Sequence, residues 1–288
     1  MPRSDRPLDR KLIRLGFRVL GRARAHGQDV WPGLRIAGGR MAWRGTDLGA
    51  LHPAADLLPH GAPLLAVVGS GPSLKDQHPE RLPPGTALLC NGAASLVPRV
   101  TPAAVAVEDE RFVFRHHAML RALPRDVALL LSPAAIRAWA ERDATSLAGR
   151  RVALIDNVEK PLGLPRRPLS DPDLRQVVLR GPRGAMSVAP DRGVVITGTV
   201  AFTALQFALA AAPERVLLAG IDLTNDAQPR FYEGADRAPS GLAAGLGRIL
   251  DGFALARDQA ERRGIALACA SPVSALLGIG YGRCDALD

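Results

Sequence analysis

The sequence predicts an α/β protein in which helices cover both faces of a mainly parallel β-sheet. From Pro63 onward, short apolar runs alternate with segments of helical periodicity, which is typical of β–α units. The apolar runs are nearly continuous, as expected of strands that are buried on both faces. With 288 residues, 47% of them hydrophobic, the chain is long enough for one large globular domain and an appendage. We therefore divide it into an N-terminal segment, residues 1–60, and a main domain, residues 61–288.

The N-terminal segment carries nearly all of the net charge. Residues 1–44 contain eleven Arg or Lys against three Asp, which is +8 of the total +9. Residues 8–25 have helical periodicity, with arginines every four residues on one side and apolar residues on the other. The two sets are Arg10, Arg14, Arg18 and Arg22, and Leu8, Leu12, Leu15, Val19, Leu20 and Ala23.

This basic amphipathic helix has two interpretations. Either it attaches to an anionic membrane surface, or it packs its apolar face on the main domain and leaves its arginines in water. The residues that follow, 34–44, predict a small hairpin that turns at Gly38 and Gly39.

The main domain is expected to contain eight strands and three long helices. The strands are predicted at 64–69, 87–91, 104–108, 127–132, 151–156, 193–197, 215–220 and 265–270, and the helices at 134–147, 199–212 and 243–263. Residues 157–192 are rich in Pro, Arg and Asp and lack periodicity, so we expect a long loop or lid there.

Composition and motifs argue against several classes of protein. The body of the chain is nearly neutral and only 4% aromatic, which disfavours nucleic-acid binding. Cys90, Cys269 and Cys284 lack metal-ligand spacing, and no HExxH, CxxC or Ser/His/Asp arrangement indicates a metal site or a hydrolase. No signal peptide and no run of about 20 apolar residues is found. We expect a cytoplasmic protein, either free or peripheral on the inner face of the membrane.

A glycine-rich turn follows the first strand of the main domain. Glycines in residues 69–75, GSGPSLK, allow a ligand to approach the main chain, and Ser73 is placed to cap a following helix whose free amides favour phosphate. Leu74 replaces the third glycine of a dinucleotide fingerprint, and the spacing is not that of a Walker A loop. A purely structural turn is the alternative.

Other polar residues also follow strands, where ligands bind in open α/β sheets. Thr197, Gly198 and Thr199 precede an apolar helix, as an anion site or as simple caps. Asp222 is expected to bind hydroxyls, act as a base or cap loop amides. The acidic run at 108–110 is either a solvated charge cluster or a sugar or metal contact. Tyr232 either donates to a leaving phosphate or packs.

Six motifs in order resemble the bacterial sialyltransferases of glycosyltransferase family 42. They are VVGSGPSLK, RLP, LCN, ITGT, LLAGID and ALACASPVSALL, and they span roughly residues 64–277. The GxGPSL and GxDL motifs also resemble motility-associated nonulosonate transferases and MptE-like diphosphokinases. The first resemblance implies a single Rossmann-like, GT-A-like nucleotide-sugar-binding domain that uses a CMP-linked acidic sugar without a metal or other cofactor.

The resemblance and the strand-end positions together define the expected nucleotide-sugar site. Its residues are Gly69, Ser70, Gly71, Pro72, Ser73, Asn91, Glu108, Thr197, Gly198, Thr199, Asp222, Thr224, Tyr232, Ser271 and Pro272. Ser70, Glu108 and Thr224 depart from the amide, asparagine and tyrosine that the family has there.

The catalytic histidine of the family is expected within residues 238–247, and the chain has none there. An inverting transfer needs a group that takes the acceptor proton. Either an acid serves, first among them Asp222, Asp109 and Glu233, with Asp226 and Asp236 as further candidates, or the mechanism differs, or activity is lost.

The expected function is transfer of an acidic sugar, such as sialic acid, Kdo or a related ulosonic acid, from CMP to a cell-surface glycan or lipid-linked acceptor. Such a reaction belongs to bacterial polysaccharide or lipopolysaccharide biosynthesis. Two alternatives stay open: an MptE-like diphosphokinase that depends on ATP and magnesium, and an inactive nucleotide-binding relative.

Overall fold

The computed structural model describes residues 6–21, 24–224, 229–233 and 245–288. Its centre is an eight-stranded sheet with the order β13-β12-β11-β4-β5-β6-β7-β8, in which every neighbouring pair is parallel. The strands are β4 Leu65–Val68, β5 Ala87–Cys90, β6 Pro102–Val107, β7 Ala128–Leu131, β8 Val152–Leu154, β11 Arg215–Ala219, β12 Ala266–Cys269 and β13 Gly282–Arg283. The order reverses direction between β4 and β11, which is the switch point where α/β proteins place their ligands.

The prediction of a parallel α/β sheet is confirmed, but the predicted strand at 193–197 is wrong. This segment makes only an isolated bridge, between Val194 and Asn157. The side chain of Gln206 replaces a neighbouring strand: its Oε1 accepts from the amide of Val195 at 3.0 Å, and its Nε2 donates to the Val195 carbonyl at 2.9 Å. An apolar run therefore lies buried and extended without joining a ladder.

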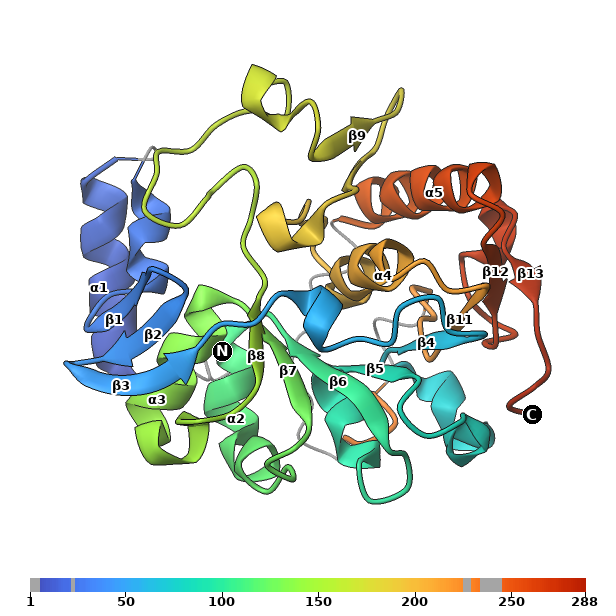
Figure 1. Ribbon diagram of the computed structural model, residues 1–288, viewed down its shortest axis with the longest axis horizontal. Helices are drawn as coiled ribbons and strands as arrows, with labels where there is room; N and C mark the ends of the chain where they lie inside the picture. The colour runs from blue at the N-terminus through green and yellow to red at the C-terminus, as the bar shows by residue number, and fades with distance from the viewer. Residues whose placement is uncertain (1–5, 22–23, 225–228, 234–244) are drawn as a thin grey trace.

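Helices cover both faces of the sheet (Figure 1). The helices α4 Val200–Ala210 and α5 Leu246–Arg262 lie on one side, and α2 Glu110–Arg121 and α3 Pro133–Leu147 lie on the other. The helices expected at 134–147, 199–212 and 243–263 are confirmed with small shifts of their ends. Helix α2 was missed, although Asp109 caps it by accepting from the Arg111 amide at 2.9 Å.

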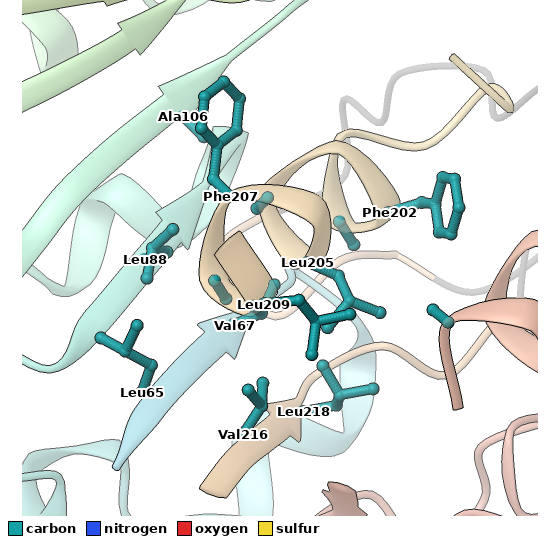
Figure 2. Close-up of a cluster of buried hydrophobic side chains, with 14 of the residues drawn as sticks. Leu65, Val67, Leu88, Ala106, Phe202, Leu205, Phe207, Leu209, Val216 and Leu218 are labelled. Carbon is teal, nitrogen blue, oxygen red and sulfur yellow. The ribbon is translucent and has the colours of Figure 1, made fainter. Parts of the chain in front are cut away.

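Side chains alternate between two apolar layers, one on each face of the sheet. Leu65 and Val67 point toward α4, and Ala66 and Val68 point toward the opposite layer. Figure 2 shows Leu205, Phe207 and Leu209 of α4 directed toward the strands, whereas Phe202 points away from them and packs on Phe253 of α5. Burial of each such side chain contributes about 1.5–3 kcal/mol, so this layer holds the strand ends in place.

The N-terminal segment contains helix α1 Leu8–Val19 and a three-stranded antiparallel sheet. The strands are β1 Leu34–Ala37, β2 Arg40–Trp43 and β3 Thr46–Ala50, and the expected hairpin turns at two glycines with positive φ, Gly38 and Gly39. A bridge between Leu51 and Val152 joins the small sheet to the edge of the large one.

Residues 157–192 form an ordered arm rather than a featureless loop. They contain the antiparallel pair β9 Val178–Arg180 and β10 Ala185–Ser187. A small apolar cluster anchors them, made by Val158, Leu174, Val177, Val178, Ala185 and Val195. In Figure 1 this arm lies beyond the carboxyl ends of the strands, between α1 and α5.

Candidate functional site

A cavity of about 490 Å³ opens at the carboxyl ends of β4, β5, β6, β7, β8 and β11. Its volume lies within the range of small-molecule sites, and it spans the switch point of the sheet. Many of the residues expected from the sequence line it: Gly69, Ser70, Gly71, Pro72, Asn91, Glu108, Asp109, Gly198, Thr199, Asp222 and Glu233. The topology thus brings together residues that are up to 164 positions apart in the chain.

The glycine-rich turn does not offer the free amides that we expected. The amides of Gly69 and Gly71 donate to the carbonyls of Ala219 and Gly220, both at 2.8 Å. A side chain at either glycine would overlap the Gly220 carbonyl. These glycines are therefore needed because β4 and β11 end in close contact, and the turn is first of all a structural one.

Asp222 connects this turn to the residues that follow β12. Its Oδ2 accepts from the Ser73 amide at 3.0 Å, and its Oδ1 accepts from the hydroxyls of Ser73 and Ser271, each at 2.6 Å. Asp222 is buried, and both oxygens are engaged. Of the three roles expected for it, this geometry favours the capping of loop groups. Ser73 does not cap a following α-helix; residues Pro72–Asp76 form a single 3-10 turn.

Several other expected site residues do not line the cavity. Ser73 and Pro272 lie in a separate surface depression, and Thr224 donates to the Val273 carbonyl at 3.0 Å. The Tyr232 ring packs where a side chain on residue 92 would be, so Gly92 is required there. The remaining two, Thr197 and Ser271, are buried beside the cavity. Asp226 and Asp236 lie outside the described residues.

The turn before α4 caps that helix and also borders the cavity. The Thr199 hydroxyl accepts from the Ala201 amide at 3.4 Å, as a helix cap does, and Thr199 also lines the cavity together with Gly198. Gly198 has a φ of +110°, a conformation that other residues rarely adopt. The N-terminus of a buried helix thus faces the cavity and favours a ligand with negative charge.

Asn91 offers an unsatisfied acceptor to a ligand. It follows β5 with a φ of +48°, and its Oδ1 is buried without a hydrogen-bond partner among the described residues. A buried polar atom without a partner costs free energy, about 1–3 kcal/mol, which a bound donor group would recover. The Oδ1 of Asn91 is therefore available to a donor group that enters the cavity.

The carboxylate of Glu108 has fewer hydrogen-bond and ion-pair partners than those of Asp222, Asp109 and Glu233. Its Oε2 accepts from the Thr203 hydroxyl on α4 at 3.0 Å, and its backbone carbonyl accepts from the Ser132 hydroxyl at 2.6 Å. Within the described part of the chain no group donates to its Oε1. Burial raises the pKa of Glu108 to about 7, against the smaller opposing effect of the Thr203 hydrogen bond.

Asp109 and Glu233 are both engaged with arginines at the rim of the cavity. Asp109 caps α2 and pairs with Arg111 at 2.5 Å. Glu233 pairs with Arg230 at 2.8 Å and accepts from the Arg230 amide at 3.1 Å. Either acid would have to leave a cation to act as a base.

The N-terminal segment supplies cations that sequence reasoning missed. Arg6 and Arg14 line the cavity and pair with the buried Glu110, which also contacts Arg10 and Arg137. Burial raises the pKa of Glu110, but the Arg6 hydrogen bond and the charges of Arg137 and Arg10 outweigh it, so the pKa is lowered. No local pattern links residues 6–14 with residue 110, so only the fold reveals this cluster.

The cavity is lined by charges of both signs. The basic residues are Arg6, Arg14, Arg111, Lys160 and Arg230, and the acidic residues are Asp29, Glu108, Asp109, Glu110, Asp156, Asp222 and Glu233. Burial is the main cause that raises the pKa values of Asp29, Glu108 and Asp156. Asp156, Asn157 and Ser132 also follow strands, so the rule that found Asn91 would have found them.

Neither a metal cluster nor a membrane span is found in the ranges described. No three His, Cys, Asp or Glu side chains among those residues are grouped as metal ligands would be. None of the helices in the same ranges is both long and apolar enough to cross a bilayer.

Comparison with protein-family models and with curated proteins finds no match. Among solved structures, the chain is similar to the sialyltransferase CstII from Campylobacter jejuni, determined in complex with a substrate analogue, cytidine-5'-monophosphate. The match covers 78% of this chain and 88% of that one, with 14% identity and a TM-score of 0.34. At this degree of similarity it assigns neither a substrate nor a site residue here, and the α/β fold stands on the strand order described above.

Proposed function

We propose that the cavity binds a CMP-linked acidic sugar and transfers the sugar to a hydroxyl of a glycan or lipid-linked acceptor. The observation that carries this proposal is the mixed lining of a cavity at the switch point of a parallel sheet. Arg6, Arg14 and Lys160 suit the phosphate and the sugar carboxylate, and the N-terminus of α4 adds to the positive field. The order of the sequence motifs, from VVGSGPSLK to ALACASPVSALL, supports the same substrate class.

The neutral part of such a donor has partners as well. The unsatisfied Oδ1 of Asn91 accepts a hydrogen bond from a hydroxyl or an amino group of the ligand. The carboxylates of Glu108 and Asp156, which follow β6 and β8, are suited to accept hydrogen bonds from sugar hydroxyls. In this proposal Asp222 and the glycine-rich turn shape the floor of the site, and they do not bind phosphate through free amides.

Thermal unfolding with CMP, CDP, UDP, ADP and ATP, each with and without magnesium, tests this proposal. We expect CMP to raise the midpoint without magnesium, because ligands that bind only the native state stabilise it by mass action. Stabilisation by ATP only with magnesium would support the diphosphokinase instead. No response to any nucleotide would contradict both and favour an inactive relative.

We also propose that α1 attaches the protein to an anionic membrane surface. The helix docks on the domain through its arginines, since Arg10 is completely buried, and not through its leucines. Its outer face exposes Leu8 by 76%, Leu12 by 69% and Val19 by 82%, together with Leu15 and Leu20. This is the reverse of the arrangement in which the apolar face packs on the domain.

Basic residues border this apolar face. Lys11 and Arg18 are exposed beside it, and each adds up to about 1 kcal/mol of attraction to anionic headgroups. The same helix contributes Arg14 to the cavity. A membrane that holds α1 would therefore lie near the site, where a lipid-linked acceptor is needed.

Flotation with vesicles tests the attachment. With vesicles of phosphatidylcholine and phosphatidylglycerol, we expect Leu12→Ser combined with Leu15→Ser to reduce binding at least tenfold, because burial of each leucine contributes about 1.5–3 kcal/mol. Leu164→Ser, which removes an equally exposed leucine in the arm 157–192, is the matched control. Equal flotation of the two variants would contradict membrane attachment through α1.

A further inference from the structure

The proposed transfer needs a proton acceptor, and most acids of the cavity are already engaged. Asp222 accepts from two serines, and Asp156 accepts from the amides of Asn157 at 2.9 Å and Leu162 at 3.2 Å. The other three, Asp109, Glu110 and Glu233, are paired with arginines. An acid whose oxygens are held by donors is a poor base, because those donors stabilise the charge that protonation would remove. This leaves Glu108 and Asp29.

The position of Glu108 favours it over Asp29. Glu108 follows β6, whose neighbour β5 is followed by Asn91, and it contacts Thr203, one turn into α4 from Thr199. Glu108 is therefore adjacent to two segments that line the cavity: the segment after β5, which carries Asn91 of the LCN motif, and the start of α4, which carries Thr199 of the ITGT motif. Asp29 lies in the N-terminal segment and, unlike Glu108, does not follow a strand of the large sheet. Burial and then the charge of Glu110 raise its pKa, against the smaller effects of Arg14, Arg137 and Lys160.

We propose that Glu108 is the general base, an inference that rests on the proposed function. Thr203 holds Oε2, and Oε1 takes the proton from the acceptor hydroxyl. The acceptor oxygen forms a bond to the anomeric carbon as the bond from that carbon to the phosphate oxygen breaks. The electron pair of the broken bond leaves with the phosphate as CMP. The proton on Glu108 then passes to solvent through the open cavity.

The groups that face Glu108 suit this role. Thr203 on α4 is its hydrogen-bond partner, the positive charge of Lys160 favours the anion, and the charge of Asp109 opposes it. Cys90 beneath it is neutral, because burial and then the charge of Glu108 raise the pKa of that thiol. With its own pKa raised to about 7 by burial, Glu108 is present partly as carboxylate at neutral pH and is basic enough to accept a proton there.

The test compares Glu108→Gln with Glu214→Gln, an isosteric control at the opposite, amino end of β11. Release of CMP from CMP-N-acetylneuraminate and from CMP-Kdo is measured between pH 5.5 and 9, and CMP binding is measured in parallel. We expect Glu108→Gln to bind CMP like the wild type but to release it at least 100-fold more slowly, since a positioned base contributes about 10²–10⁴-fold. Glu214→Gln should match the wild type.

Thr203→Val tests whether Thr203 positions Glu108. Its readout is the pH profile of the rate, which a purely structural role of Thr203 would not shift. The wild-type rate should rise with pH through a midpoint near 7 and then level off. Thr203→Val removes the hydrogen bond that lowers the pKa of Glu108, so the midpoint should move to higher pH while the plateau remains. Loss of rate at all pH values with an unchanged midpoint would overturn the role of Thr203.

The measurements distinguish a wrong base from a wrong function. Glu108→Gln that binds CMP and keeps its rate within threefold overturns the base, as does loss of the rate in Asp29→Asn instead. A wild-type chain that neither binds CMP nor releases it overturns the proposed function. An infrared difference between wild type and Glu108→Gln follows the carboxyl group itself, and a titration midpoint below 5 would also overturn the base.

Discussion

Glu108 and Glu110 stand two residues apart, yet they belong to opposite regions of the molecule. Glu110 begins α2 and faces α1, where four arginines converge on it and lower its pKa. Glu108 faces α4, where a single hydroxyl meets it and burial raises its pKa to about 7. Glu110 is buried and Glu108 is half-buried, and only Glu110 has cations close enough to outweigh the effect of burial on its pKa. One glutamate fastens a helix, and the other is left available for chemistry.

The two helices that these glutamates meet are packed in opposite ways. Helix α4 is buried along nearly its whole length and packs Leu205 and Phe207 against the sheet (Figure 2). Helix α1 buries Arg10 and leaves its leucines outside. Apolar burial drives the first contact, and pairing with Glu110 holds the second. The comparison predicts that the two contacts respond differently to mutation and pH.

The largest effect is expected in α4. Phe207→Ala should lower the free energy of unfolding by about 3–5 kcal/mol, because it removes a fully buried ring and leaves a cavity. Urea unfolding at pH 7 and at pH 5 measures this. The loss should be the same at both pH values, and a strong pH dependence would contradict apolar packing as its cause.

Glu110→Gln should lower the free energy of unfolding by about 3 kcal/mol at pH 7, because Arg10 stays buried without an anion and Arg137 keeps only Glu141 as a partner. The pKa of Glu110 is lowered in the folded protein, so its contribution is present above pH 4.5 and is lost as the pH falls through the folded pKa. The difference from wild type should thus shrink in acid.

Hydrogen exchange should show the same change locally, with loss of protection in α1 at neutral pH. Glu80→Gln, which removes an exposed pair with Arg99, is the matched control and should show no measurable loss. Full protection of α1 in Glu110→Gln would contradict docking through this glutamate.

Glu108→Gln should change the free energy of unfolding in the opposite direction to Glu110→Gln. Between pH 4.5 and about 7 the folded wild type holds a proton that the unfolded chain has lost, so stability falls as pH rises through this window. Replacement by glutamine removes that penalty and should raise the free energy of unfolding by about 2 kcal/mol at pH 8. At pH 4 the two proteins should be equal. Destabilisation at pH 8 would show that Glu108 is held as a paired anion.

The smallest effect on stability is expected on the outer face of α1. Leu12→Ser should change the free energy of unfolding by less than about 0.5 kcal/mol, because this side chain contacts solvent. Thermal unfolding without vesicles measures it. A loss above about 1 kcal/mol would mean that the leucine face is covered within the protein and is not a free surface.

The sequence by itself determined the class of fold and most of the sheet. Continuous apolar runs such as 64–69 and 215–220 need burial on both faces, and a parallel sheet between helices provides it. The rule that ligands lie beyond the carboxyl ends of strands then located Asn91, Glu108 and Asp222 without coordinates. These are local signals, since each depends on a short run and on the residue that ends it.

Only the tertiary structure decided how those residues are used. It showed that Asp222 and the amides of Gly69 and Gly71 are satisfied within the protein, whereas the Oδ1 of Asn91 is not. It also turned Arg10 and Arg14 of α1 inward, toward a glutamate about a hundred positions away. Hydrogen-bond partners and ion pairs depend on three-dimensional contact between distant segments, and no periodicity along the chain records them.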